Sequence, residues 1–289
     1  MIKRLNTTAI VGLALVGLVV LAALISFVWL PFDPTATNPA DRLQNPSGTH
    51  WFGTDKYGRD TFSAVLVGAR ITLMVGFIAV SIAAVIGTPL GIIAGMFPGK
   101  FSEVLLRASD VALAFPALLL AIMLTAVYGA STLTAMVAIG IAAVPVYTRI
   151  AYSGTRQVMH FEFIQAARLG GQSSLRIALR HVLPNISGML LVQSSISFGI
   201  AVLAEAALSF LGLGTPPPTP SWGRMLQESQ QFLGTHPLLA VFPGLAIALT
   251  VLGCNLLGDG LRDRLDSRLA AANTGGRRAG SAARRVVRP

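Results

Sequence analysis

Few residues in this sequence have the types and spacing that catalysis or metal binding requires. No pair of its four histidines has the H-E-x-x-H spacing or another metal-ligand spacing, and no Gly-x-Ser-x-Gly nucleophile elbow is present. The nearest approach to the phosphate loop G-x-x-x-x-G-K-[ST] runs from Gly95 to Phe101, but its glycine spacing is wrong and neither Ser nor Thr follows Lys100. The sequence therefore predicts a chain that is not an enzyme, holds no cofactor or metal of its own and does not bind ATP by this loop. The histidines are His50, His160, His181 and His236.

One acidic residue, Glu205, interrupts a long apolar run. Placing an acidic side chain at the centre of a membrane helix costs about 2.5–3.5 kcal/mol on insertion scales. Glu205 is either a structural acid near the outer end of its helix, bonded to a neighbouring helix, or a contact for a substrate or a proton. A lone acid without a chain of partners favours the structural interpretation. The single cysteine, Cys254, excludes an internal disulfide.

The elements that must position these residues are membrane helices. Of the 289 residues, 53% are hydrophobic and only 12% are charged, and the mean hydropathy is +0.68. A soluble domain carries about 25% charged residues, so the solvent that faces this chain is lipid. The net charge of +10 is explained by basic residues on cytoplasmic loops, and we expect no nucleic-acid partner.

Six apolar runs reach the length of about 20 residues that a helix needs to cross a bilayer. They are Thr8–Leu30, Ile71–Met96, Val104–Tyr128, Thr132–Tyr152, Ile186–Leu211 and Leu238–Leu257. The first run is too long for the core of a signal peptide, so we expect it to be retained. Lys and Arg gather on the segments that an inside N-terminus would place in the cytoplasm, which predicts both termini cytoplasmic.

These runs divide the chain into four parts. We expect an N-terminal stub with the first span (1–30), an outer loop (31–68), a five-helix core (69–258) with an internal loop at 153–185, and a cytoplasmic tail (259–289) disordered from about 270. The end of the outer loop, Asp60–Arg70, has an apolar helical face and predicts a short interfacial helix that runs into the second span.

Prolines and glycines recur within the predicted spans. Each proline removes a backbone donor and tends to kink its helix, whereas small residues let helices approach closely. The prolines are Pro89, Pro116, Pro145 and Pro243, and the clearest glycine series is Gly87, Gly91 and Gly95. The Pro98-Gly99-Lys100 stretch predicts a tight inner turn between the second and third spans.

The internal loop has the pattern of two short helices separated by glycine. The first is expected to run through Leu169, with Gly171 in the left-handed conformation that follows a helix end. Pro184 is expected to open the fifth span, where a missing N–H costs nothing. The small residues Ala166 and Ala167 would let another protein approach the backbone, although an ordinary amphipathic connector has the same pattern.

This loop resembles the EAA loop of ABC importer permeases, E-A-A-x-x-x-G-x(9)-I-x-L-P. Gln165-Ala166-Ala167 match the EAA positions, Gly171 matches the glycine, and Leu183-Pro184 match the final pair. Gln165 stands where the family has an acid, and His181 where it has isoleucine. The resemblance implies that these residues couple the chain to an ATPase subunit.

Four further strings resemble the dipeptide and oligopeptide permease C subunits. They are His50–Asp60, which contains G-T-D-x-x-G-R-D, then Glu205–Gly214, Pro216–Leu226 and Leu257–Asp266. Together with the loop they cover most of residues 45–268. Nickel and glutathione importers of the same group share these strings.

The resemblance implies an all-α membrane protein with six transmembrane helices and the type I ABC importer permease fold, in the bacterial inner membrane. It implies a permease subunit for di- and oligopeptides that pairs with a B-type permease. The other expected partners are two ATPase subunits, or one fused ATPase, that bind ATP and Mg²⁺, and an extracytoplasmic binding protein. A nickel or other metal chelate and glutathione are the alternative ligands. An ion-coupled secondary transporter is the alternative from a different class, and an intramembrane enzyme is disfavoured.

Overall fold

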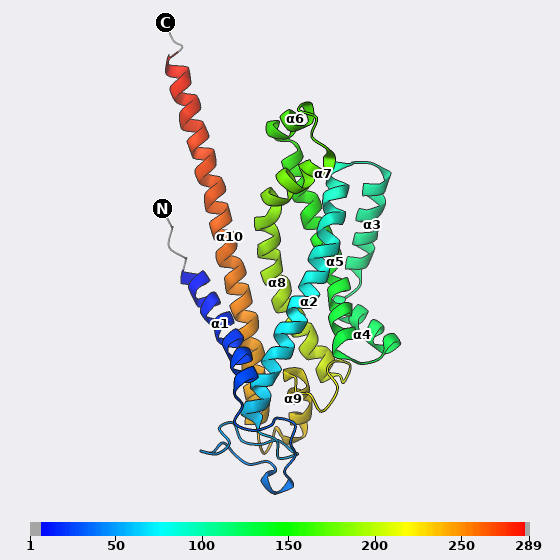
Figure 1. Cartoon of the computed structure of the whole chain (residues 1–289), viewed down its shortest axis with the longest axis vertical. Helices are drawn as coiled ribbons and strands as arrows, with labels where there is room; N and C mark the ends of the chain where they lie inside the picture. The colour runs from blue at the N-terminus through cyan, green and yellow to red at the C-terminus, as the bar shows by residue number, and fades with distance from the viewer. Residues whose placement is uncertain (1–6, 287–289) are drawn as a thin grey trace.

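A computed structural model of the chain describes the backbone of residues 7–286 and the side chains of residues 7–264. Across this range the chain is helical, and its one β-type pairing is an isolated bridge between Thr54 and Asp60 (Figure 1). The α-helices are α1 (Thr7–Val28), α2 (Thr61–Met96), α3 (Lys100–Ala114), α4 (Ala117–Tyr128), α5 (Thr132–Met159), α6 (Glu162–Leu169), α7 (Ser174–Ile177), α8 (Leu183–Phe210), α9 (Trp222–Ser229) and α10 (Leu238–Val286). Short 3-10 helices lie at Pro39–Asp41 and Gln230–Phe232, and a π-helical segment lies at Ala178–Val182.

Within the described range, five helices are long and apolar enough to cross a membrane, and a bent pair makes up to six. The predicted third span, Val104–Tyr128, is a bent pair of helices, since α3 and α4 meet at an angle of 86°. Phe115 between them is extended, with φ −85° and ψ 132°. Pro116 explains this break, since a proline disfavours helical geometry in the residue before it and offers no N–H. Pro89, Pro145 and Pro243 lie inside continuous helices.

The residues expected as a short interfacial helix that runs into the second span, 60–70, are the cap and first turns of α2, which continues unbroken to Met96. Asp60 caps this helix, because its side chain accepts a hydrogen bond from the Ser63 amide at 2.8 Å. The tail expected to be disordered from about residue 270 lies outside the part of the chain whose side chains the structure describes, and the expectation stays a prediction.

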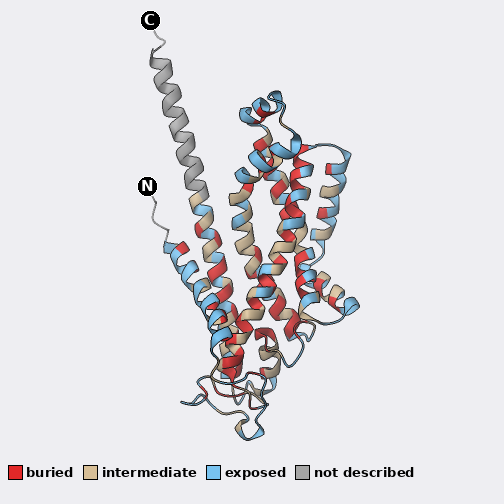
Figure 2. Ribbon diagram, viewed as in Figure 1, coloured by how far each residue is buried: buried red, intermediate tan, exposed pale blue. Residues whose placement is uncertain are grey.

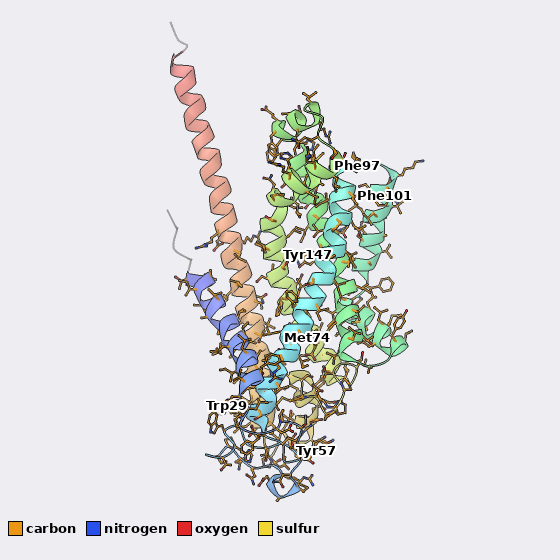
Figure 3. The ribbon with its side chains drawn as sticks, viewed as in Figure 1. Trp29, Tyr57, Met74, Phe97, Phe101 and Tyr147 are labelled. Carbon is orange, nitrogen blue, oxygen red and sulfur yellow. The ribbon has the colours of Figure 1, made fainter. Side chains whose placement is uncertain are left out.

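The bundle has two distinct ends (Figure 1). The first, the α6 end, carries α6, α7 and the turn between α2 and α3. The second, the α9 end, carries the 29–60 loop and α9. Figure 3 shows Phe97 and Phe101 near the α6 end and Trp29 and Tyr57 toward the α9 end. The turn between Met96 and Lys100 confirms the tight connection that the Pro98-Gly99-Lys100 stretch predicts.

Helices α2 and α5 pack through the predicted glycine series. A Cβ atom added to Gly87 would lie 2.6 Å from the Val144 carbonyl oxygen, and one added to Gly95 would lie 2.7 Å from the Thr155 side chain. Real Cβ atoms are not found at such distances, so these positions require glycine. Buried residues gather along this contact (Figure 2), and the Tyr147 side chain is fully buried beside it with its hydroxyl 2.9 Å from Ser194 of α8.

Candidate functional site

Helix α6 ends in a glycine-dependent cap. The Gln172 N–H donates to the Ala167 carbonyl at 3.1 Å, and the Gly171 N–H donates to the Arg168 carbonyl at 3.0 Å. This pair of bonds is the Schellman motif, which satisfies carbonyls that a helix end leaves free. Gly171 has φ +70°, as the sequence predicts, whereas Gly170 before it has φ −74°.

The small residues of α6 face in two directions. Ile164 and Ala167 are buried and pack with Ile177, Val182 and Ile186 from the following segment. Gln165 and Ala166 are exposed. The amphipathic turn of α6 therefore places Ala167 against its own chain and leaves Ala166 exposed.

The segment after Gly171 runs into α8 as one helical rod. Gln172, just before this rod, is joined by its side chain to His181 within the rod, with 3.1 Å between the His181 Nε2 and the Gln172 Oε1. The Leu183 N–H donates to the Ala178 carbonyl, a π-type bond that precedes Pro184 at the start of α8. Pro184 has no N–H to donate, which fits a local departure from α-helical bonding at this point. Pro184 is exposed and Leu183 is partly buried.

The exposed surface of the α6 end is apolar, and no other segment of the described chain covers it. Leu169 is 91% exposed, and Leu175 and Leu179 are 69% and 58% exposed. Phe161 and Phe163 are also exposed and stack on each other with their centroids 5.5 Å apart. Exposed apolar side chains grouped around one short helix are typical of a protein contact.

Glu205 lies near the α9 end of α8 and is 1% exposed. Its Oε1 accepts a hydrogen bond from Ser209 at 2.7 Å, one turn later on the same helix, and its Oε2 has no partner at hydrogen-bond distance. The Ser209 hydroxyl in turn accepts from the Thr215 N–H at 3.2 Å, and Ser221 at the start of α9 lies close to the same carboxyl. Glu205 thus organises the connection from α8 to α9, and its closest bond lies within α8 rather than to a neighbouring helix.

The G-T-D-x-x-G-R-D string builds the loop that covers the α9 end. Gly53 and Gly58 have φ +72° and +76°, a conformation that side chains rarely adopt. The Asp55 Oδ1 accepts from the amides of Tyr57 and Arg59 at 2.7 and 3.0 Å. The motif residues therefore act in folding this loop, a role that the spacing alone did not reveal.

Arg59 connects this loop to α9. Its guanidinium contacts Asp55 at 2.6 Å and Glu228 at 2.6 Å, and Arg224 holds the other oxygen of Glu228 at 3.0 Å. Burial of the guanidinium disfavours its charge, but the Asp55 and Glu228 carboxylates outweigh this effect and leave the pKa of Arg59 above its usual value. Arg59 is therefore a permanent positive charge between two carboxylates.

A cavity of about 340 Å³ opens where α3 breaks into α4. Its wall is formed by α2, the α3–α4 break, α5 and α8, and is apolar except at Gln193 and Ser197. The Gln193 amide donates to the Ser197 hydroxyl at 3.0 Å. Such an apolar cavity with a few polar groups suits a small organic molecule better than an ion.

An ion pair joins α3 to α5 beside this cavity. Arg149 contacts Asp110, and both side chains are about half exposed, at 52% and 51%. The two residues lie one helical turn from the cavity residues Val146 and Leu113, toward the α6 end. This pairing was not predicted from the sequence, although opposite charges within neighbouring spans are a signal for it.

The comparisons with known proteins agree over most of the chain. Residues 87–271 match the family described as "Binding-protein-dependent transport system inner membrane component". The chain is 45% identical over 265 residues to the dipeptide transport system permease protein DppC of Alkalihalophilus pseudofirmus, which covers 91% of this chain and 87% of that protein. It is 41% identical over 258 residues to the glutathione transport system permease protein GsiD of Pectobacterium atrosepticum, covering 88% of this chain and 86% of that protein.

A solved structure supports the fold. An inward-facing structure of the MetNI methionine ABC transporter matches with a TM-score of 0.57 at 18% identity, covering 69% of this chain and 95% of that chain. At this identity the match is evidence for the fold alone, and it confirms the expected type I ABC importer permease fold. Together with the apolar helices, these matches indicate a multi-pass inner membrane protein. The chain belongs to the family of binding-protein-dependent transport system inner membrane components, the permeases of ABC importers.

Proposed function

We propose that this chain is the permease subunit that forms half of the translocation pathway in an ATP-driven importer of di- and oligopeptides. The observation that carries the proposal is the 45% identity to a dipeptide permease over 91% of the chain. The second candidate ligand is glutathione, favoured by identities of 41% and 42% to glutathione permeases. Both ligands have a free amino group, free carboxylate and amide bonds, which one pathway can accommodate.

In this proposal the α6 end is cytoplasmic and meets an ATPase subunit. The exposed side chains of Gln165 and Ala166, together with the apolar Phe163 and Leu169, supply the contact. Gly171, Leu183 and Pro184 act indirectly, since they set the direction in which α6 projects from α8. A B-type permease completes the pathway, and an extracytoplasmic binding protein delivers the ligand to the α9 end.

Transport in this arrangement is a switch between two states of the paired permeases. Helix α6 follows α5 after only two residues, His160 and Phe161, whose amides donate back to Gln157 and Val158. A displacement of α6 by its ATPase partner would therefore move α5, which lines the cavity. The two polar groups at Gln193 and Ser197 leave most of the wall without specific contacts, which suits ligands with variable side chains.

The proposal is tested by reconstituting the complete transporter, with binding protein, in proteoliposomes. We expect uptake of radiolabelled Ala-Ala that requires ATP and exceeds uptake of glutathione at equal concentration. Uptake of glutathione alone would replace the peptide assignment. Uptake driven by a proton or sodium gradient in vesicles without ATPase subunits would overturn the importer assignment in favour of an ion-coupled transporter.

A further inference from the structure

The Asp110–Arg149 pair stands at an unusual place for two charges. Asp110 lies ten residues after the start of α3 at Lys100, and Arg149 ten residues before the end of α5 at Met159. At about 1.5 Å per residue, each is about 15 Å from the α6 end of its helix. Residues 111–148, between the two, contain no charged side chain, so the pair lies at the edge of the uncharged part of the bundle, deeper than Ile186, which packs against Gly154 of α5.

The exposure of this pair limits what can face it. Both side chains are about half exposed on the chain by itself. Charged side chains at this depth are costly against hydrocarbon and almost always face a bundle interior or a water-filled space. Lipid is therefore a poor neighbour for this face of α3 and α5, and water in a pathway shared with a second permease is a good one.

The position of the cavity indicates which water-filled space the pair faces. Val146 and Leu113 line the cavity, and Arg149 and Asp110 follow on the same helical faces, one turn nearer the α6 end. A ligand that leaves the cavity along these two helical faces toward the α6 end would pass the pair. Among the ion pairs of the described residues, it is also the one that joins α3 to α5.

We infer that Asp110 and Arg149 form a charged exit from the cavity that exchanges its internal partners for the two ends of a peptide. This inference rests on the proposed function. Arg149 contacts the peptide carboxylate, and its planar guanidinium suits that group. Asp110 contacts the peptide ammonium. In the empty state the two residues satisfy each other, so neither charge is left unpaired at membrane depth.

The exchange has a measurable consequence for charge selection. Removing Arg149 leaves the Asp110 carboxylate, which repels anionic peptides and attracts cationic ones, and removing Asp110 does the reverse. A bridge with only a structural role would lower the uptake of all peptides by the same factor. The sign of the change therefore separates a ligand contact from a structural bridge.

The experiment uses the complete reconstituted transporter and three peptides with free termini: Ala-Glu, Ala-Ala and Ala-Lys. Because the binding protein is the same throughout, its preferences cancel in the ratio of variant to wild-type rates. Arg149→Gln should raise the rate ratio of Ala-Lys to Ala-Glu about tenfold, and Asp110→Asn should lower it about tenfold, as expected for unit charges a few ångströms apart. Arg107→Gln, which removes an exposed ion pair with Glu103 on the same α3, should leave the ratio unchanged.

A second measurement leaves the pair intact. Val146→Cys in a Cys254→Ala background should react with a charged, membrane-impermeant thiol reagent in the assembled complex, and millimolar Ala-Ala should slow the reaction. An unreactive Cys at position 146 would place this face against lipid or the partner and would overturn the inference. Equal changes in the uptake of all three peptides would make the pair a structural bridge and would also overturn it. A complex that fails to transport Ala-Ala in the wild-type form contradicts the proposed function instead.

Discussion

The Gln172 amide donates to the Ala167 carbonyl, 3.1 Å away, across a glycine with φ +70°. This bond ends α6 and turns the chain toward α7. It links the buried side of α6 to the start of the helical rod that becomes α8. The direction in which α6 projects thus depends on one backbone conformation at Gly171.

Gly171→Val should disturb this turn, because a left-handed conformation costs a residue with a Cβ roughly 1–2 kcal/mol. Such a cost changes a conformational population by a factor of about 5–30. We expect peptide uptake and stimulated ATPase activity of the complex to fall together. Ligand binding by the binding protein should not change.

Gly170→Ala is the matched control for that variant. Gly170 has φ −74°, and a Cβ there would meet its nearest atom at an ordinary 3.4 Å. This variant should keep wild-type transport. If Gly171→Val also kept wild-type transport and ATPase stimulation, the loop would be a simple connector.

Gly87→Leu should destabilise the contact between α2 and α5, where a Cβ already lies 2.6 Å from the Val144 carbonyl oxygen. Overpacking of this kind commonly costs about 1–3 kcal/mol. The readout is the thermal unfolding midpoint of the purified complex in detergent. Gly17→Leu is the control, since nothing lies within 4 Å of a Cβ at that position of α1. Equal midpoints for the two variants would argue against a close-packed α2–α5 contact.

Arg59 and Glu228 should behave as one unit in a double-mutant cycle. Each side chain is only 12% exposed, so Arg59→Gln or Glu228→Gln leaves the other charge poorly solvated. We expect the double variant to unfold at nearly the same temperature as either single variant, with a coupling of about 0.5–3 kcal/mol. The exposed pair of Glu103 and Arg107 should show no coupling above error. Additive effects at Arg59 and Glu228 would mean that the ion pair between them contributes nothing to stability.

Glu205→Gln separates the structural and the proton-carrying interpretations of this buried acid. Glutamine keeps an oxygen to accept the Ser209 hydrogen bond and cannot release a proton. We expect uptake within about twofold of wild type, because the variant keeps its buried hydrogen bond and therefore loses little stability. Glu205→Ala removes that bond and should lower the amount of assembled complex. Loss of uptake in Glu205→Gln with normal assembly would favour a proton-carrying role.

The orientation of the chain is tested by cysteine accessibility in a Cys254→Ala background. Ser47→Cys and Thr235→Cys, both exposed at the α9 end, should react with an impermeant reagent from outside intact cells. Ser174→Cys at the α6 end should react only after permeabilisation. The reverse pattern would invert the expected topology. Ser221 is unsuitable for this purpose because its side chain is fully buried and caps α9.

Hydropathy and turn chemistry were sufficient for most helices and for the Gly171 cap, because both depend on residues close in sequence. Pro116 predicts a kink in the third span, but the size of the bend between α3 and α4 could not be predicted, because apolar residues continue through Phe115 and Pro116 and hydropathy is insensitive to direction. The buried state of Ala167 was missed because it depends on Ile177 and Ile186, which reach α6 only after the chain has turned back.

The cavity and its exit could not be predicted from the sequence. Asp110 and Arg149 are 39 residues apart, and their pairing depends on how α3 crosses α5. The Arg59–Glu228 contact spans 169 residues and depends on the fold of the 29–60 loop against α9. Long-range contacts of this kind leave no periodic pattern in the residues that form them.

The glycine contact between α2 and α5 also has a mechanical meaning. Helices whose backbones approach this closely, with side chains of one fitted against glycines of the other, interlock, so α2 and α5 should tilt as a single stiff rod. One end of this rod carries α6 after a two-residue joint, and the other is anchored where Asp60 holds both His50 and the first turn of α2. A push at α6 would then pivot the rod about its anchored end and move the helix faces that border the cavity through a proportionate arc.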